Sequence, residues 1–161
     1  MTLGTPNPRQ REFLACEKKY VAFGGARGGG KSWAVRRKCI MLGMRYDGLK
    51  ILLLRRTLPE LRENHILPMM EGVYGYADYH ETQRAFLFPN GSRIKMGYCD
   101  AESDVYQYQG QEYDVIAMEE ATHFTERQRM FLTTANRSTR ADFTPRMYYT
   151  ANPGGVGHGW F

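Results

Sequence analysis

The sequence is poor in the features that mark secreted, zinc-binding and membrane-spanning chains. It holds only three cysteines, Cys16, Cys39 and Cys99, an odd number without the spacing of a zinc site. We interpret them as reduced thiols in an intracellular setting. The sequence also lacks a signal-like start, and no apolar run approaches the length of a membrane span. These absences predict a soluble cytoplasmic protein without a membrane partner.

Internal repeats, linkers and low-complexity segments are also missing. The chain has 161 residues, of which 42% are hydrophobic, and this is enough for one sizeable core. We therefore expect residues 1–161 to form one domain. The net charge of +5 is compatible with a polyanionic partner, although such modest basicity also occurs in proteins that never contact nucleic acid.

A glycine-rich stretch at residues 20–32 joins an apolar, strand-like run to a helix-like segment. Gly25, four further residues and then Gly30-Lys31-Ser32 form the pattern of loops that bind nucleoside triphosphates. In such loops the backbone amides wrap the phosphates, the lysine reaches the outer phosphates and the hydroxyl ligates magnesium. A flexible glycine loop is the alternative, but the strand and helix on either side favour nucleotide binding. The predicted phosphate loop consists of Gly25, Ala26, Arg27, Gly28, Gly29, Gly30, Lys31 and Ser32.

Apolar runs bounded by turn signals predict a three-layer α/β sandwich with a mostly parallel sheet. We expect the strands that begin at Tyr20 and Asp114 to be neighbours, with helices on both faces of the sheet. Residues 85–88 and 92–98 flank Pro-Asn-Gly and predict an inserted or edge β-hairpin. The predicted strands are residues 20–23, 50–54, 85–88, 92–98, 114–118 and 146–151.

Helices are predicted between these strands. The segment after Ser32 should be largely buried, with a polar patch at residues 36–38. Thr57 and Glu60 have capping-box spacing and open a helix that we expect to end near Pro68. The same spacing, at Thr125 and Gln128, opens a helix to about residue 136.

Charged residues follow two of the buried strands. Glu119 and Glu120 come directly after residues 114–118, where a phosphate loop would need a metal ligand and a group that orients water. We predict that Glu119 holds magnesium, directly or through water, and that Glu120 is the general base. The alternative is a charge pair at a helix start. Arg55 and Arg56 end the strand of residues 50–54 and are either functional or a solvated strand terminus.

The order of these motifs resembles the large terminase subunit of tailed double-stranded DNA phages, the ATPase that drives genome packaging. The resemblance covers nearly the whole chain. The phosphate loop by itself is generic, whereas the order of all the motifs is fairly specific. The resemblance rests on residues 25–32, on residues 108–114 leading into Glu119-Glu120-Ala121-Thr122, and on Thr150-Ala151-Asn152-Pro153-Gly154.

The resemblance implies a P-loop NTPase domain of the RecA-like type that uses ATP and Mg²⁺. It implies that Arg27 faces the γ-phosphate and acts with Lys31 and Glu120 in catalysis, and that Gln10 recognises adenine. A solvated helix residue is the alternative for Gln10. Thr150, Ala151 and Asn152 would couple hydrolysis to movement. The implied partners are double-stranded DNA, the portal protein and the small terminase subunit, in the host cytoplasm during phage assembly.

The chain departs from the family pattern at the acid pair, because Glu119 stands where many members carry aspartate. Members also carry a C-terminal nuclease region with a two-metal carboxylate cluster. We expect this chain to be a fragment that lacks that region and has no nuclease activity. A homo-oligomeric ring is implied during packaging, with a monomer as the alternative for the chain alone. The candidates for an arginine supplied by a neighbouring subunit are Arg127, Arg129 and Arg137.

Two other functions remain open on the sequence. One is a different RecA-like nucleic-acid motor, which would need a second motor lobe or an unwinding element. The other is a nucleotide-gated assembly or DNA-binding module with little turnover. Hydrolysis measured with and without DNA and partner proteins distinguishes these alternatives from a packaging ATPase.

Overall fold

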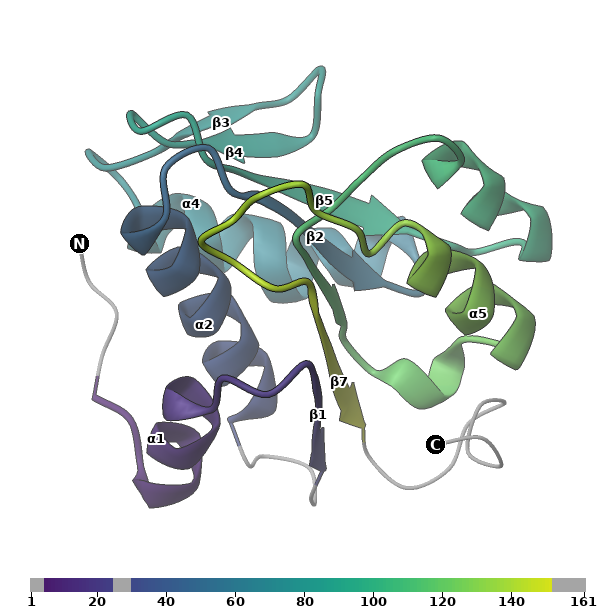
Figure 1. Cartoon of the computed structure of the whole chain (residues 1–161), viewed down its shortest axis with the longest axis horizontal. Helices are drawn as coiled ribbons and strands as arrows, with labels where there is room; N and C mark the ends of the chain where they lie inside the picture. Colours follow the sequence, from purple (N-terminus) through teal and green to yellow (C-terminus); the bar gives the residue numbers. More distant parts are fainter. Residues whose placement is uncertain (1–4, 25–29, 152–161) are drawn as a thin grey trace.

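A computed structural model describes residues 5–24 and 30–151, and in these ranges seven strands form one sheet in the order β1-β7-β6-β2-β5-β4-β3 (Figure 1). The strands are β1 (Tyr20–Gly24), β2 (Lys50–Arg55), β3 (Asp78–His80), β4 (Ala85–Leu87), β5 (Arg93–Tyr98), β6 (Val115–Met118) and β7 (Arg146–Ala151). The α-helices are α1 (Pro8–Ala15), α2 (Lys31–Arg45), α3 (Leu58–Leu61), α4 (Leu67–Gly72) and α5 (Glu126–Thr134). A π-helical turn, η1 (Arg62–Ile66), and two 3₁₀ helices, η2 (Glu102–Tyr108) and η3 (Ala121–His123), complete the set.

Five strands that are consecutive in the sheet pair in parallel, as predicted, namely β1, β7, β6, β2 and β5. The expected neighbours were wrong, however, because β7 lies between the strands that begin at Tyr20 and at Val115. All six residues of β7 are buried, whereas β1 is partly exposed. A fully buried strand needs partners on both sides for its backbone groups, and this places β7 inside the sheet and β1 at its edge.

The predicted hairpin is confirmed, since β4 and β5 pair antiparallel around a turn at Asn90-Gly91. Gly91 has a φ of 85°, a left-handed conformation that favours glycine. The hairpin is not a separate insertion, because β5 also pairs in parallel with β2. The short strand β3, which the sequence pattern did not reveal, extends this edge by pairing with β4.

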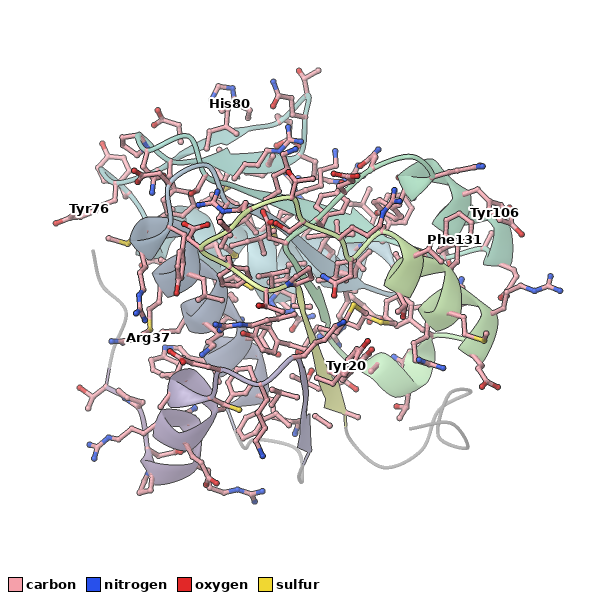
Figure 2. The ribbon with its side chains drawn as sticks, in the orientation of Figure 1. Tyr20, Arg37, Tyr76, His80, Tyr106 and Phe131 are labelled. Carbon is pink, nitrogen blue, oxygen red and sulfur yellow. The ribbon has the colours of Figure 1, made fainter. Side chains whose placement is uncertain are left out.

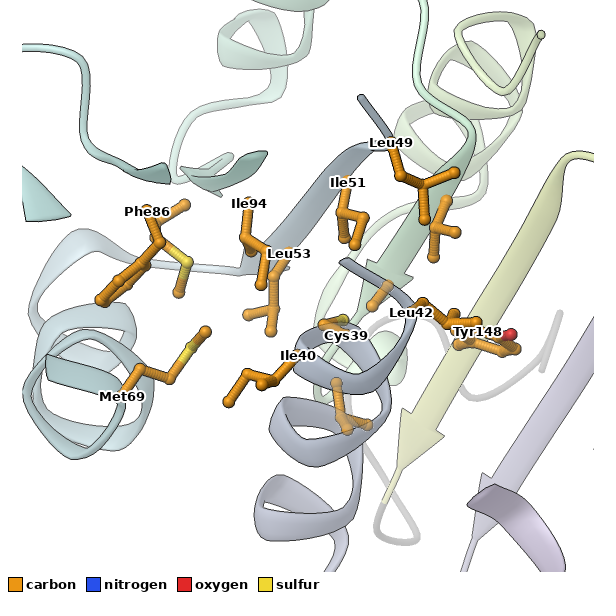
Figure 3. Packing of buried hydrophobic residues seen from close by; sticks show 14 of the residues in the cluster. Cys39, Ile40, Leu42, Leu49, Ile51, Leu53, Met69, Phe86, Ile94 and Tyr148 are labelled. Carbon is orange, nitrogen blue, oxygen red and sulfur yellow. The ribbon is translucent and has the colours of Figure 1, made fainter. Parts of the chain in front are cut away.

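Alternate residues of β2 pack on opposite faces of the sheet and define the three layers. Ile51 and Leu53 join the cluster under α1, α2 and the helices of residues 58–72 (Figure 3). Leu52 and Leu54 join a second cluster with η2, η3 and α5. Because both faces are covered, the run of one isoleucine and three leucines in β2, all fully buried, is the pattern expected of a parallel strand.

Helix α2 is largely buried as predicted, but its polar patch is not a solvated surface. Lys38 is buried, and its ammonium group donates hydrogen bonds to the carbonyls of Leu14 and, at 2.9 Å, Cys16. Burial lowers the pKa of Lys38 to about 8, with Arg146 adding to the effect. The lysine therefore joins α2 to the segment between α1 and β1 instead of facing water.

The helical segment after β2 continues beyond Pro68, so the predicted end near this residue was wrong. Residues 58–72 are helical throughout, and η1 forms a π turn just before the proline. Pro68 has no N–H, and the carbonyl of Asn64 that would normally accept from position 68 instead accepts from Arg36 Nη1 at 2.6 Å. The N–H of Leu67 donates to the carbonyl of Arg62. The π turn thus absorbs the proline without ending the helix.

Of the two predicted capping boxes, one is formed. Thr125 and Gln128 cap α5 reciprocally, as expected. The side chain of Thr57 makes no capping hydrogen bond, and the carboxylate of Glu60 pairs with Arg55 Nε at 3.1 Å instead of reaching back to residue 57. Within residues 5–24 and 30–151, every helix is too short or too polar to cross a lipid bilayer.

Candidate active site

The predicted site residues gather where α2 begins, at the carboxyl ends of β6 and β7 (Figure 1). Lys31, only 7% exposed, is the first residue of α2, and Ser32 follows it. Gly30 precedes them with a φ of 71°. Six predicted site residues lie outside the described residues, namely Gly25, Ala26, Arg27, Gly28, Gly29 and Asn152.

Gln10 lies against the end of the phosphate loop instead of facing solvent. It is 7% exposed, and it caps α1 reciprocally with Asn7. Its Nε2 donates to the carbonyl of Gly30 at 3.1 Å. The left-handed backbone at position 30 favours glycine, and a Cβ there would lie 2.2 Å from this nitrogen and displace the Gln10 amide.

Glu119 is the centre of the site. It follows β6, is 1% exposed and accepts hydrogen bonds from two hydroxyl groups that come from different elements. Ser32 donates to Oε1 and Thr150 donates to Oε2. Arg55 Nη1, at the end of β2, lies 3.5 Å from Oε1. The structure therefore brings together Ser32 and Glu119, the two residues that the sequence predicted as magnesium ligands, although 87 positions separate them.

The surroundings of Glu119 favour its ionised form. Burial alone would raise the pKa of this carboxyl group, but His65, Ser32 and Thr150 lower it more, so the pKa lies below its usual value. Burial also lowers the pKa of His65, against the opposing effect of Glu119.

Glu120 has the left-handed backbone conformation, with φ 55° and ψ 54°. This conformation costs a residue other than glycine about 1 kcal/mol and is found most often at functional sites. Its N–H donates to Thr150 Oγ1 at 3.2 Å, and its Oε2 lies 3.8 Å from His123 Nε2. The hydroxyl of Thr150 thus bonds to both residues of the acid pair, to the carboxylate of Glu119 and to the backbone N–H of Glu120.

Two residues near Glu119 were not assigned by the sequence patterns. Arg55 had been left open, and it now contacts both Glu119 and Glu60. His65 is fully buried on the π turn, with Nε2 3.7 Å from Glu119 Oε1. The sequence signal that could have found it is Pro68, which marks a distorted helical turn just before it.

The residues present suit a magnesium ion. Mg²⁺ prefers oxygen ligands and is usually held by one or two carboxylates together with the phosphates of a nucleotide. The hydroxyl of Ser32 and the ionised carboxylate of Glu119 supply such oxygens at the start of α2. Among the described residues, no cluster of three or more histidines, cysteines and acids offers another metal site.

Thr150 provides a test of this network in the folded protein. Replacing it by valine keeps the shape but removes the buried donor of Glu119, and we expect the free energy of unfolding to fall by about 1–3 kcal/mol. Urea denaturation monitored by circular dichroism measures the change. The control is Thr134→Val, which removes an exposed hydroxyl that donates to the carbonyl of Phe131. Equal unfolding midpoints for the two variants would contradict the network.

Comparisons with known proteins agree with one another. The model of a family described as phage terminase large subunit matches residues 17–160. No curated protein sequence matches the chain. Among solved structures, the large terminase of a thermophilic bacteriophage superposes with a TM-score of 0.77 and 17% identity, covering 91% of this chain and 39% of its own length. The same terminase in complex with ADP gives a TM-score of 0.75 and 16% identity, covering 91% of this chain and 38% of the terminase.

Isolated ATPase domains also match. The ATPase domain of the large terminase from Thermus phage P74-26 gives a TM-score of 0.69 and 14% identity, covering 98% of this chain and 69% of that domain. At such low identities these likenesses show the fold, which is that of terminase ATPase domains of the RecA-like type. The chain spans about two fifths, or 39%, of the length of the large terminase of the thermophilic bacteriophage.

Proposed function

The chain belongs to the phage terminase large subunit family, and on that premise we propose that it is a magnesium-dependent ATPase that powers translocation of double-stranded DNA into a procapsid. The observation that carries the proposal is the contact of Ser32 and Glu119 at the start of α2. It joins a phosphate-loop hydroxyl to an ionised acid at a strand end, and this is the pairing that P-loop ATPases need around their metal. The complexes of a related terminase with ADP and with ATP-γ-S support the choice of nucleotide.

Each site residue has a role in this proposal. The amides of residues 25–30 and the ammonium group of Lys31 bind the phosphates, with Arg27 directed at the γ-phosphate. Ser32 and Glu119 hold Mg²⁺, and the ion supplies neutralisation of the charge that develops on the phosphates. Gln10 recognises adenine in this proposal, a role that comes from the family resemblance, and its Nε2 donates to the carbonyl of Gly30.

Glu120 is the general base. Its left-handed backbone and its bond to Thr150 hold the residue at the carboxyl edge of the sheet, next to Glu119. Thr150, Ala151 and Asn152 couple hydrolysis to movement. The two contacts of Thr150 with the acid pair support this assignment, since they connect β7 to both acids.

We further propose that residues 1–161 form one ATPase domain that works with double-stranded DNA, a portal protein and a small terminase subunit. The domain would act as a ring of identical subunits in the host cytoplasm during phage assembly. Hydrolysis of ATP by the purified chain, measured with and without Mg²⁺, DNA and procapsids, tests the proposal. Activity that requires Mg²⁺ and rises with DNA and procapsids is expected. Absence of turnover under all these conditions would favour a nucleotide-gated binding module.

We do not expect this chain to cut DNA. Cleavage of phosphodiester bonds by two metals needs a cluster of acids, and Glu119 and Glu120 are engaged in nucleotide chemistry. Plasmid incubated with the chain and Mn²⁺ should remain intact. A DNA-cleaving activity that copurifies with the chain, and that disappears when carboxylates of the chain are replaced, would contradict this expectation.

A further inference from the structure

The most unusual buried group in the molecule is the imidazole of His65. It is 0% exposed, and neither ring nitrogen has a hydrogen-bond partner among the described residues. A buried polar group without a partner is unfavourable, and an apolar side chain would fill the same space without that cost. The position of Nε2, 3.7 Å from Glu119 Oε1, points to the partner that the ring is suited to bind.

The π turn determines where this ring lies. In η1 the chain is widened before Pro68, and the turn is attached to α2 by the hydrogen bond from Arg36 to the carbonyl of Asn64. Helix α2 is also the element that begins with Lys31 and Ser32. His65 is therefore fixed relative to the helix that carries the predicted metal-binding hydroxyl, and π turns are frequent at functional sites.

Two arginines flank the pair formed by His65 and Glu119. Arg36 donates to the carbonyl of Asn64 on the same turn as His65, and Arg55 Nη1 lies 3.5 Å from the same oxygen of Glu119. An imidazole N–H can donate to a carboxylate oxygen and so fix the orientation of Glu119.

We propose that His65 is the positioning residue of the metal-binding carboxylate, with the Nε2–H of its ring donating to Glu119 Oε1. This inference rests on the proposed function, in which Glu119 holds Mg²⁺. A small rotation of either side chain closes the 3.7 Å separation to a hydrogen bond, as commonly happens when a site is filled. Partners of this kind typically change metal affinity by about 10–100-fold when they are removed.

A pair of amide substitutions separates this role from packing. Glutamine places its amide nitrogen where histidine has Nε2, whereas asparagine places its amide nitrogen nearer to Nδ1. The affinity for ADP is measured by calorimetry with Mg²⁺ and with EDTA. Mg²⁺ should strengthen ADP binding about 10–100-fold less in His65→Asn than in the wild type. In His65→Gln this effect of Mg²⁺ should be largely restored. The affinity for ADP measured in EDTA should be the same in all three proteins. His80→Phe is the control, because His80 is exposed on β3 at the far edge of the sheet from Tyr20 (Figure 2).

The outcomes are distinguishable. If wild-type chain shows no Mg²⁺-dependent affinity for ADP, the proposed function fails. If wild type shows it and His65→Asn retains it in full, or if both variants lose it equally, the role of His65 is wrong. If the variants do not fold, the wild-type chain can be measured directly. Nitrogen NMR of the wild type with Mg²⁺ and ADP should show that His65 carries its proton on Nε2. Protonation at Nδ1 alone would overturn the inference.

Discussion

Replacing Glu120 by glutamine is expected to leave ATP bound but to slow its hydrolysis by at least about a hundredfold, a barrier increase of roughly 3 kcal/mol. Glutamine has nearly the same shape but cannot accept the proton of the attacking water. The backbone of Glu120 is held by its N–H bond to Thr150, so the substitution should not disturb Glu119. Single-turnover hydrolysis measured beside nucleotide affinity separates the chemical step from binding.

The matched control for this variant is Glu126→Gln. Glu126 is exposed in the first turn of α5, where its carboxylate lies 3.9 Å from Arg129 Nη2. Its replacement should change the hydrolysis rate less than about twofold, since exposed ion pairs of this kind contribute little. Hydrolysis by Glu120→Gln at near the wild-type rate, with wild type active under the same conditions, would show that another group is the base.

Replacing Lys31 by alanine is expected to abolish nucleotide binding, with a loss in affinity of at least about a hundredfold. Lys31 begins α2, where the helix dipole already favours anions, and its ammonium group supplies the full positive charge for the outer phosphates. Calorimetric titration with ATP-γ-S and Mg²⁺ measures the effect.

Lys50→Ala is the control for Lys31→Ala. Lys50 is exposed at the start of β2, and its side chain lies at the opposite end of the strand from Arg55 and the acid pair. Removing it lowers the net charge equally but should leave nucleotide affinity unchanged. Unchanged affinity in Lys31→Ala would refute the assignment of the phosphate loop, whereas equal losses in both variants would show that only general electrostatic attraction had been removed.

The site was predictable where the signal is local in the sequence. The glycine pattern before Lys31 and the two acids after a buried strand each require only a few neighbouring residues to be recognised. The rule that ligands bind beyond the carboxyl ends of parallel strands then brings Ser32 and Glu119 to the same edge. Their contact follows from these three observations. The buried strand β2 and the cap of α5 were likewise predicted from local signals, an apolar run and the spacing of Thr125 and Gln128.

The rest depends on contacts between distant segments. The place of β7 between β1 and β6 follows from complete burial, which its mixed sequence of tyrosines, threonine and arginine does not suggest. The sequence left Gln10 as either a solvated helix residue or an adenine-binding residue; the structure buries its amide against Gly30, and adenine binding stays a prediction. Pro68 signals a distorted turn near His65, but the contact of His65 with Glu119 is between distant segments, as is the bond from Arg36 to the carbonyl that Pro68 leaves unbonded.

The most direct test of the proposed site is the position of the metal. Crystals of the chain grown with ATP-γ-S and Mn²⁺ in place of Mg²⁺ allow the ion to be found by its anomalous scattering. We predict one peak between the hydroxyl of Ser32, the carboxylate of Glu119 and the nucleotide phosphates, with Glu119 bound directly or through one water. A nucleotide bound away from Lys31, or a metal that contacts neither Ser32 nor Glu119 even through water, would contradict it.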